Sequence, residues 1–270
     1  MSGGRQRTRA ALAQNLFSSQ APARRLARLS GVGPGERVYD FGAGTGRLTT
    51  ELVKAGACVI AVEKDPTLAA KLATRFAGRH VTVLRADLAD VRFQAPFKVA
   101  ANLPFNATAA ALRRLLFETP RPDAAALVLQ REAARKWAGA GRATLVSLSA
   151  RPWFEMEVVE AFARSDFTPV PAVETALLRV RRKPHPDLAD ADAESWRAFL
   201  GYALARPAPD ARRVLRGLLS NLQWRRLSGS LGIAPNALRA DLAYEQWLGL
   251  FRFVRVHAPR HKLRRLGGAG

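Results

Sequence analysis

The sequence predicts an α/β fold in which helices flank a parallel sheet, followed by a smaller helical domain. Short apolar runs alternate with amphipathic helical patterns over residues 37–129, which is typical of a parallel sheet with helices on both faces. Further along, Lys183-Pro184-His185-Pro186 and an acidic stretch at 187–194 indicate a linker. We therefore expect a basic N-terminal arm at 1–30, a sheet domain at 31–183, and a helical C-terminal domain with a basic tail at 184–270.

Seven strands are expected in the sheet domain. Helical patterns follow most of the first five, so these strands should be parallel. Only a proline-containing connection, Asp166 to Val173, joins the last two, which predicts an antiparallel pair at one edge. The expected strands are Arg37–Phe41, Cys58–Glu63, Val81–Arg85, Lys98–Asn102, Ala125–Leu129, Trp153–Phe162 and Thr175–Arg182.

Residues 195–255 have the apolar spacing of helices, and three apolar faces should form the core of the small domain. The first face holds Trp196, Phe199, Leu200 and Ala203, the second Leu215, Leu218, Leu219 and Leu222, and the third Leu242, Trp247, Leu248 and Phe251.

The charge balance indicates a polyanionic partner. The 270 residues include 43 Lys and Arg against 22 Asp and Glu, a formal net charge of +21, which makes nucleic acid the first candidate. No acidic residue precedes Glu36 or follows Glu245, so the two ends should face phosphate. The basic residues of these ends are Arg5, Arg7, Arg9, Arg24, Arg25, Arg28, Arg252, Arg255, Arg260, Lys262, Arg264 and Arg265.

Several classes of protein are excluded by composition. The single cysteine, Cys58, allows no intramolecular disulfide and no Cys-rich zinc site. No run of 18 apolar residues exists, so no membrane association is expected. The four histidines lack carboxylates at ligand spacing, so we expect no metal. A cytoplasmic monomer fits these observations.

A glycine-rich turn follows the first predicted strand. Gly42, Gly44 and Gly46 allow a ligand to touch the backbone, and Glu63 ends the next strand, where a carboxylate accepts hydrogen bonds from ribose hydroxyls. Arg47 stands where the dinucleotide fingerprint requires glycine, so NAD fits poorly. By itself the pattern also suits a tight turn in any doubly wound fold.

The glycine spacing resembles the first motif of S-adenosylmethionine-dependent methyltransferases. That resemblance implies that Glu63 holds the ribose of the cofactor. It also implies that Asp87, which closes the third strand, accepts a hydrogen bond from the adenine amino group. Both carboxylates follow strands at the sheet edge where ligands of open α/β sheets bind.

The fourth strand ends in Asn102-Leu103-Pro104-Phe105. An exocyclic purine amine is a poor nucleophile, because its lone pair is delocalised into the ring. If the Asn102 side-chain oxygen and the Leu103 carbonyl accept its two N–H bonds, the nitrogen can pyramidalise toward a sulfonium methyl. Pro104 fixes the turn, and Phe105 offers a flat face for an extruded base. The alternative is an ordinary strand-to-helix turn.

Further motifs make the resemblance more specific. Together with Asn102–Phe105, the segments Ala13–Phe17, Leu129–Glu132 and Asp166–Val173 look like the rRNA adenine N6-dimethyltransferase superfamily. The segments Arg131–Lys136, Ala150–Phe154 and Gln246–Phe251 resemble its erythromycin-resistance (Erm) branch, especially actinobacterial members, and coverage runs from about residue 5 to 255.

The resemblance implies a Rossmann-like, seven-stranded S-adenosylmethionine-dependent methyltransferase fold with a small all-helical C-terminal domain. It also implies transfer of one or two methyl groups to N6 of one adenine in 23S rRNA, free or in an immature large subunit. Such methylation confers macrolide, lincosamide and streptogramin B resistance.

Residue by residue, the resemblance assigns a catalytic turn, a cofactor pocket and two base-contacting rings. The turn is Asn102, Leu103, Pro104 and Phe105, and the base would contact Phe105 and Phe167. For Phe167, bracing of a rigid turn is an equal alternative. The cofactor residues would be Asn15, Phe17, Gly42, Gly44, Glu63, Asp87 and Asn102.

Two rival functions remain open at this point. Housekeeping dimethylation of 16S rRNA uses the same catalytic turn. A non-catalytic RNA-binding or ribosome-assembly factor could keep the fold, although the intact Asn102–Phe105 turn and Glu63 argue against lost activity.

Overall fold

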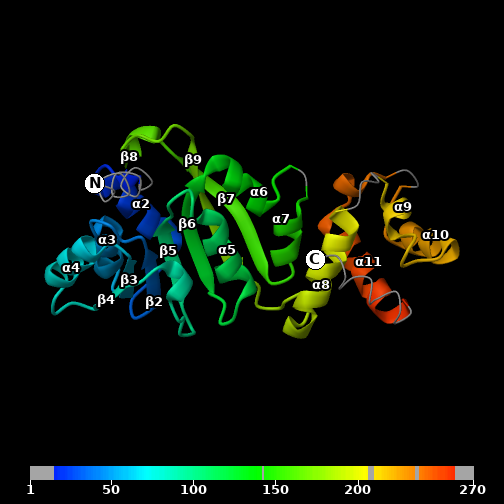
Figure 1. Ribbon diagram of the computed structural model, residues 1–270, viewed down its shortest axis with the longest axis horizontal. Helices are drawn as coiled ribbons and strands as arrows, with labels where there is room; N and C mark the ends of the chain where they lie inside the picture. The colour runs from blue at the N-terminus through cyan, green and yellow to red at the C-terminus, as the bar shows by residue number, and fades with distance from the viewer. Residues whose placement is uncertain (1–14, 142, 206–209, 235–236, 259–270) are drawn as a thin grey trace, which may run out of the picture. The chain divides into compact units, whose positions relative to one another are not determined.

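The computed structural model describes residues 15–141, 143–205, 210–234 and 237–258 (Figure 1). The chain divides into two compact units: a sheet unit, which runs to Ala138 and includes Glu155–Arg182, and a helical unit of Gly139–Phe154 and the chain from Lys183 onward. These boundaries differ from the expected domains in two places. Residues 20–30 belong to the sheet unit rather than to an arm, and residues 139–154 belong to the helical unit.

The sheet unit contains the seven predicted strands, in the spatial order β4-β3-β2-β5-β6-β9-β7. Strands β2 to β6 pair in parallel, and β9 runs antiparallel to β6, which confirms the predicted fold class. The strands are β2 (Arg37–Phe41), β3 (Cys58–Glu63), β4 (Val81–Arg85), β5 (Lys98–Asn102), β6 (Ala124–Gln130), β7 (Phe154–Phe162) and β9 (Thr175–Arg182).

Strands β7 and β9 are neighbours at the end of the sheet. Ion pairs link Arg179 to Glu157 at 2.8 Å and Arg181 to Glu155 at 3.6 Å, so residue numbers rise along one strand as they fall along the other. This antiparallel arrangement is the one predicted. The connection between the two strands also contains η2 (Arg164–Asp166) and a short strand, β8 (Phe167–Thr168), which pairs antiparallel with β1 (Leu16–Phe17).

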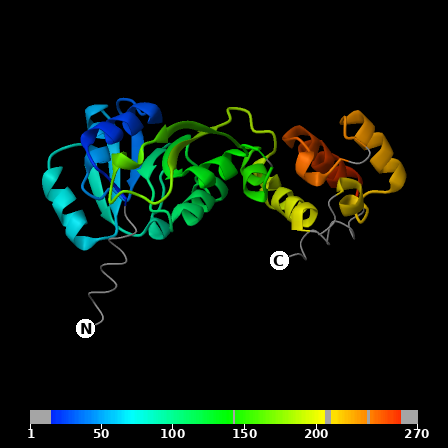
Figure 2. The ribbon, with the colours of Figure 1, turned by 90° about the horizontal axis from the view of Figure 1, so that it is seen from above.

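Helices α2 (Gln20–Ser30) and α3 (Arg47–Lys54) cover one face of the sheet, and α5 (Thr108–Phe117) covers the other (Figure 2). Leu26 of α2 is fully buried in the same core cluster as Val38 and Val59. This apolar face explains why residues 20–30 join the sheet unit. Helix α4 (Pro66–Arg75) follows β3, and α6 (Arg131–Ala138) follows β6.

The α5 face of the sheet is only partly covered. Four aromatic rings, those of Tyr39, Phe41, Phe93 and Phe97, pack together over β2 with centroids 5.0–6.0 Å apart. After β4, the chain forms only a single turn, η1 (Leu88–Asp90), before it returns to β5. Among the described residues, no full helix therefore packs over β3 and β4 on this face.

The helical unit contains α7 (Leu145–Ala150), η3 (Asp190–Asp192), α8 (Ala193–Ala205), α9 (Ala211–Leu215), α10 (Asn221–Ser230), η4 (Arg239–Asp241) and α11 (Tyr244–His257). Its core includes the rings of Trp196 and Phe251, with centroids 5.2 Å apart. The Trp196 indole donates to the Leu148 carbonyl at 3.0 Å, which ties α7 to this unit. The prediction for Leu222 was wrong: it lies in the first turn of α10 and is 60% exposed, because the apolar face of that helix is carried by Trp224 and Leu227.

Several of the basic residues expected to face phosphate are paired within the protein. Arg24 binds Glu51 at 3.3 Å, Arg25 binds Asp166 at 2.8 Å, and Arg255 pairs with Asp192. The remaining basic residues at the extreme ends lie outside the described residues: Arg5, Arg7, Arg9, Arg260, Lys262, Arg264 and Arg265.

Over the described ranges, no helix has the length and apolarity needed to cross a membrane. The same residues contain no cluster of three or more His, Cys, Asp or Glu side chains suited to a metal ion.

Candidate active site

The glycine turn between β2 and α3 has a conformation that requires glycine. Gly42, Gly44 and Gly46 have φ values of 67°, 56° and 77°, in the left-handed region that L side chains rarely adopt. A Cβ atom on Gly44 would also lie 2.8 Å from the Leu16 side chain. The turn therefore presents bare backbone at the carboxyl edge of the sheet, as the sequence predicted.

Glu63 holds this turn to the neighbouring strand. Its carboxylate is 1% exposed, and its Oε2 accepts from the Gly44 N–H at 2.9 Å. Its Oε1 accepts from the Asp65 N–H, also at 2.9 Å. Each oxygen retains a second lone pair, so the carboxylate both shapes the turn and remains chemically able to accept from a ribose hydroxyl.

Asp40 is a buried carboxylate that sequence reasoning missed. It is 2% exposed and accepts from the Thr49 hydroxyl at 2.6 Å. Burial raises its pKa to about 7, and the charge of Glu63 acts in the same direction. An aspartate in an apolar strand directly before a glycine turn was the available signal, because such a position is rarely buried without a role.

Asn102 lies at the end of β5, and its side chain is oriented by the N-terminal segment. The Nδ2 atom donates to the Asn15 carbonyl at 2.6 Å. Because the amide nitrogen is held there, Oδ1 remains as the acceptor. Phe105, three residues later, is half-buried, so part of its ring is accessible.

Strand adjacency brings this turn to the glycine turn. Strand β5 pairs directly with β2, and a Cβ on Gly42 would lie 3.8 Å from Pro104. The Leu103 N–H donates to the Val128 carbonyl at 3.3 Å, which ties the tetrapeptide to the next strand. Two motifs that are separate in the sequence thus meet at one edge of the sheet.

The N-terminal segment is anchored by β8. The Phe17 ring stacks on Phe167 with centroids 5.5 Å apart, and both rings contact Phe162. Phe167 is 1% exposed and packs in this cluster, which favours the alternative that it braces a turn over the alternative that it contacts the base. Phe17 is 5% exposed and packs mainly into the same core.

A small cavity of about 20 Å³ lies where the two turns meet. Its lining includes Phe17, Gly42 and Asn102, which the sequence predicted, and Asp40, which it did not. The bare glycine backbone and the buried carboxylates fit a cationic nucleoside such as S-adenosylmethionine. Drug-sized ligands need about 300 Å³ or more, so residues that line this cavity must move to admit it.

Asp87 stands apart from this cavity. Its side chain is 54% exposed, caps η1 through the Ala89 N–H at 3.1 Å, and lies 3.9 Å from Lys64. It follows β4, next to the strand that ends in Glu63. Asp87 therefore follows a strand at the carboxyl edge of the sheet, and its contact with the adenine stays a prediction.

Comparison with known proteins agrees with the sequence motifs. The family model described as ribosomal RNA adenine dimethylase matches residues 5–255. The mycinamicin-resistance protein MyrB of Micromonospora griseorubida is 31% identical over 253 residues, which cover 92% of this chain and 80% of that protein. An rRNA adenine N-6-methyltransferase of Streptomyces fradiae is 32% identical over 261 residues, which cover 92% of this chain and 79% of the relative.

A solved structure is similar over almost the whole chain. The crystal structure of the 23S rRNA methyltransferase ErmE has a TM-score of 0.80 and 29% sequence identity, covering 89% of this chain and 100% of that one. A dimethyladenosine transferase from Plasmodium falciparum shares the fold, with a TM-score of 0.74 at 18% identity over 90% of this chain and 98% of that one.

Proposed function

Because the chain belongs to the ribosomal RNA adenine dimethylase family, we propose that it transfers methyl groups from S-adenosylmethionine to N6 of one adenine in 23S rRNA. The observation that carries this proposal is the Asn102 side chain at the end of β5. Its amide nitrogen is bound by the Asn15 carbonyl, which leaves an oriented acceptor beside the glycine turn.

The chemistry follows from that acceptor. S-adenosylmethionine supplies an electrophilic methyl group on a sulfonium. Asn102 Oδ1 and the Leu103 carbonyl accept the two N–H bonds of the adenine amine, which directs the nitrogen lone pair out of the ring plane. Phe105 stacks on the extruded base. No strong general base is needed, because the methylated nitrogen is cationic and readily loses its proton.

The cofactor residues proposed from the family pattern are supported by their positions. Gly42 and Gly44 offer bare backbone, Glu63 offers a buried carboxylate, and Asp87 stands at the next strand end. Asn15 and Phe17 contribute from the N-terminal segment, which closes over the cavity. Asp40 joins this set as a buried carboxylate in the cavity lining.

The large-subunit target and the resistance role rest on the relatives. MyrB is named for mycinamicin resistance and ErmE for 23S rRNA, and each matches about nine tenths of this chain. We infer that the chain acts as a cytoplasmic monomer on 23S rRNA, free or in an immature large subunit. The resulting N6 methylation confers macrolide, lincosamide and streptogramin B resistance.

Mapping the modified nucleotide tests the proposal. Naked 23S and 16S rRNA are incubated separately with the protein and S-adenosylmethionine labelled on the methyl group, and the labelled adenine is located by primer extension and mass spectrometry. Label at one adenine of 23S rRNA is expected. Label in 16S rRNA alone would identify small-subunit dimethylation instead, and label in neither would favour a non-catalytic RNA-binding protein.

A further inference from the structure

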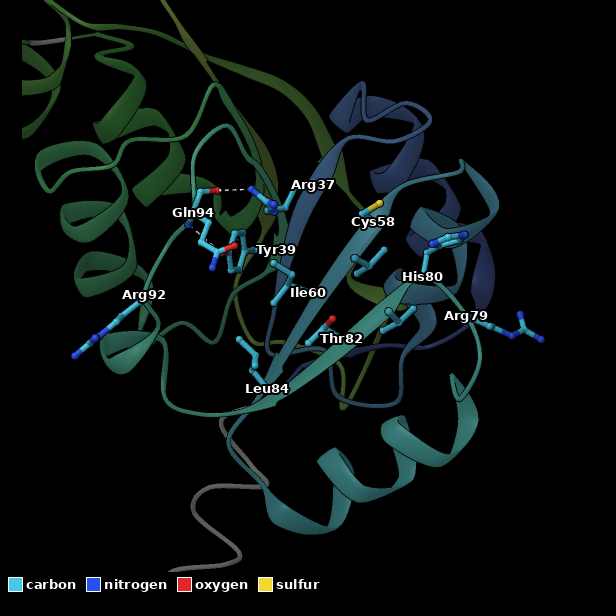
Figure 3. A pocket seen from close by; sticks show the side chains of 12 residues that line it. Arg37, Tyr39, Cys58, Ile60, Arg79, His80, Thr82, Leu84, Arg92 and Gln94 are labelled. Carbon is cyan, nitrogen blue, oxygen red and sulfur yellow. Dashed lines mark hydrogen bonds between the residues drawn. The ribbon is translucent and has the colours of Figure 1, made fainter.

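An open groove of about 490 Å³ lies on the sheet unit, away from the glycine turn (Figure 3). Its floor is formed by alternate residues of three neighbouring strands, which therefore point to the same face of the sheet. These floor residues are Arg37 and Tyr39 of β2, Cys58 and Ile60 of β3, and Thr82 and Leu84 of β4. We call this feature the β3–β4 groove.

The groove is open because no helix of the described part of the chain covers this region of the sheet. On the opposite face, α4 packs Leu72 against Ala61 of β3. On the groove face, the chain after β4 provides only η1 and an extended return, whose Gln94 carbonyl accepts from Arg37 at 3.0 Å. Cys58 and Thr82 are exposed as a result, and Ile60 and Leu84 are half-buried.

The rim of the groove is cationic. Arg92 stands on one side and Arg79 on the other, both exposed, and Figure 3 shows their side chains extending outward from the floor of the groove. His80 lies next to Arg79 in the groove lining, which contains no carboxylate. Among the described residues, neither the Arg79 nor the Arg92 guanidinium has an ion-pair partner, unlike Arg24 and Arg25 of α2.

We propose that the β3–β4 groove is a docking surface for a single-stranded segment of the RNA substrate, outside the methylation site. Unpaired arginines on both rims suit backbone phosphates, and the strip of Ile60 and Leu84 suits base faces. The exposed Thr82 hydroxyl offers a hydrogen-bonding group between them. The proposal rests on the proposed function, because it assumes that the substrate is a large RNA.

Charge favours RNA over a protein partner. The core of a protein–protein interface is depleted of charged residues, whereas this lining holds Arg37, Arg79 and Arg92 and no acidic residue. The groove begins at Leu84, three positions before Asp87, and continues along β4 toward His80. An RNA strand that leaves the carboxyl edge of the sheet can therefore follow β4 across this face.

The single cysteine allows a direct test with the full-length protein. Cys58 is exposed in the groove floor, so an aryl azide can be attached to its thiol and photolysed in the complex with 23S rRNA. A crosslink to RNA is expected. The matched control carries Cys58→Ser and Lys71→Cys, which moves the probe to the exposed side of α4 on the opposite face of the sheet, where a much weaker crosslink is expected.

Neutralisation of the rim provides the second measurement. Arg79→Gln and Arg92→Gln should each weaken rRNA binding and reduce the slope of log Kd against log salt concentration by about one. Affinity for S-adenosylmethionine and the maximal rate at saturating RNA should not change. Lys71→Gln, with the same loss of charge, should leave the salt slope as in the wild type.

The outcomes separate this proposal from the proposed function. Absence of a Cys58 crosslink to RNA while 23S rRNA is still methylated overturns the groove proposal alone. Crosslinking to a ribosomal protein in assembled particles, with none to naked RNA, also overturns it. Crosslinking to RNA without methylation of either rRNA supports the groove as an RNA surface and overturns the proposed methyltransferase activity.

Discussion

The carboxyl edge between β2 and β5 and the β3–β4 groove are built in opposite ways. The first is nearly closed, with a cavity of about 20 Å³ and the buried carboxylates Asp40 and Glu63. The second is open, with about 490 Å³ of space and arginines on its rims. Buried carboxyl groups and bare glycine backbone suit a small cofactor, whereas positive charge and an exposed floor suit a large polyanion.

The two regions should therefore respond differently to mutation. At the closed edge, single polar atoms have defined partners, such as the Asn15 carbonyl for Asn102 Nδ2 and the Gly44 N–H for Glu63 Oε2. Loss of one atom should therefore have a large effect. In the groove, binding depends on summed charge, so single substitutions should have small, salt-dependent effects.

The largest effect is expected at Asn102. Asn102→Ala removes the acceptor for the adenine amine and should lower kcat by about 10²- to 10³-fold, while rRNA binding is retained. Single-turnover methylation and filter binding measure the two quantities. Asn102→Asp is the sharper variant: it keeps an acceptor but places a carboxylate against the Asn15 carbonyl, so it should be comparably inactive. Wild-type turnover by Asn102→Ala would contradict the proposed amine geometry.

A pH effect on stability is expected from Asp40. Burial raises its pKa from 3.8 to about 7, so the folded state holds the proton more tightly than the unfolded chain. Stability should therefore fall as pH rises between about 4 and 7, and Asp40→Asn should remove that loss. The free energy of unfolding of Asp40→Asn minus that of the wild type, measured in urea, should be roughly 2–3 kcal/mol larger at pH 8 than at pH 5. Asp90→Asn, at an exposed position, is the control. If the difference in unfolding free energy between Asp40→Asn and the wild type is the same at pH 5 and pH 8, the raised pKa of Asp40 is refuted.

The smallest effect is expected for Glu63→Gln, which should lower the free energy of unfolding. The amide would place an NH₂ group against one of two backbone donors, Gly44 N–H or Asp65 N–H, that now bind carboxylate oxygens. An amide costs less to bury than a carboxylate, so the net loss of unfolding free energy should be about 1–2 kcal/mol. Calorimetry should also show weaker S-adenosylmethionine binding. If neither quantity changes, Glu63 does not support the turn.

The sequence was most informative where a pattern repeats over many residues. Apolar strands alternate with helices through the sheet unit, so β2, β3, β4 and β5 were predicted with their observed bounds. The comparisons confirm the family and with it the cofactor class. The assignments of individual site residues stay predictions, because only ligand-bound measurements test them.

The parts that escaped prediction depend on contacts between distant segments. Strands β1 and β8 have two residues each, too short for a periodic pattern, and each forms only because the other is present. That pairing buries Phe167, for which base contact and bracing of a turn were equal alternatives in the sequence. The β3–β4 groove was not predicted, because it results from the lack of a helix after β4 rather than from a sequence motif. The prediction that Leu222 is buried was wrong, because α10 begins at Asn221 and directs that side chain outward.

The pairing of β1 with β8 also has a consequence for synthesis on the ribosome. Ser18 and Ser165, hydrogen-bonded at 2.8 Å beside this pair, are 147 residues apart in the chain. Until the ribosome has translated beyond Thr168, Leu16 and Phe17 have no strand to pair with, and Asn15 is not held against Asn102. A nascent chain therefore acquires a complete methyl-transfer site only late in its own translation.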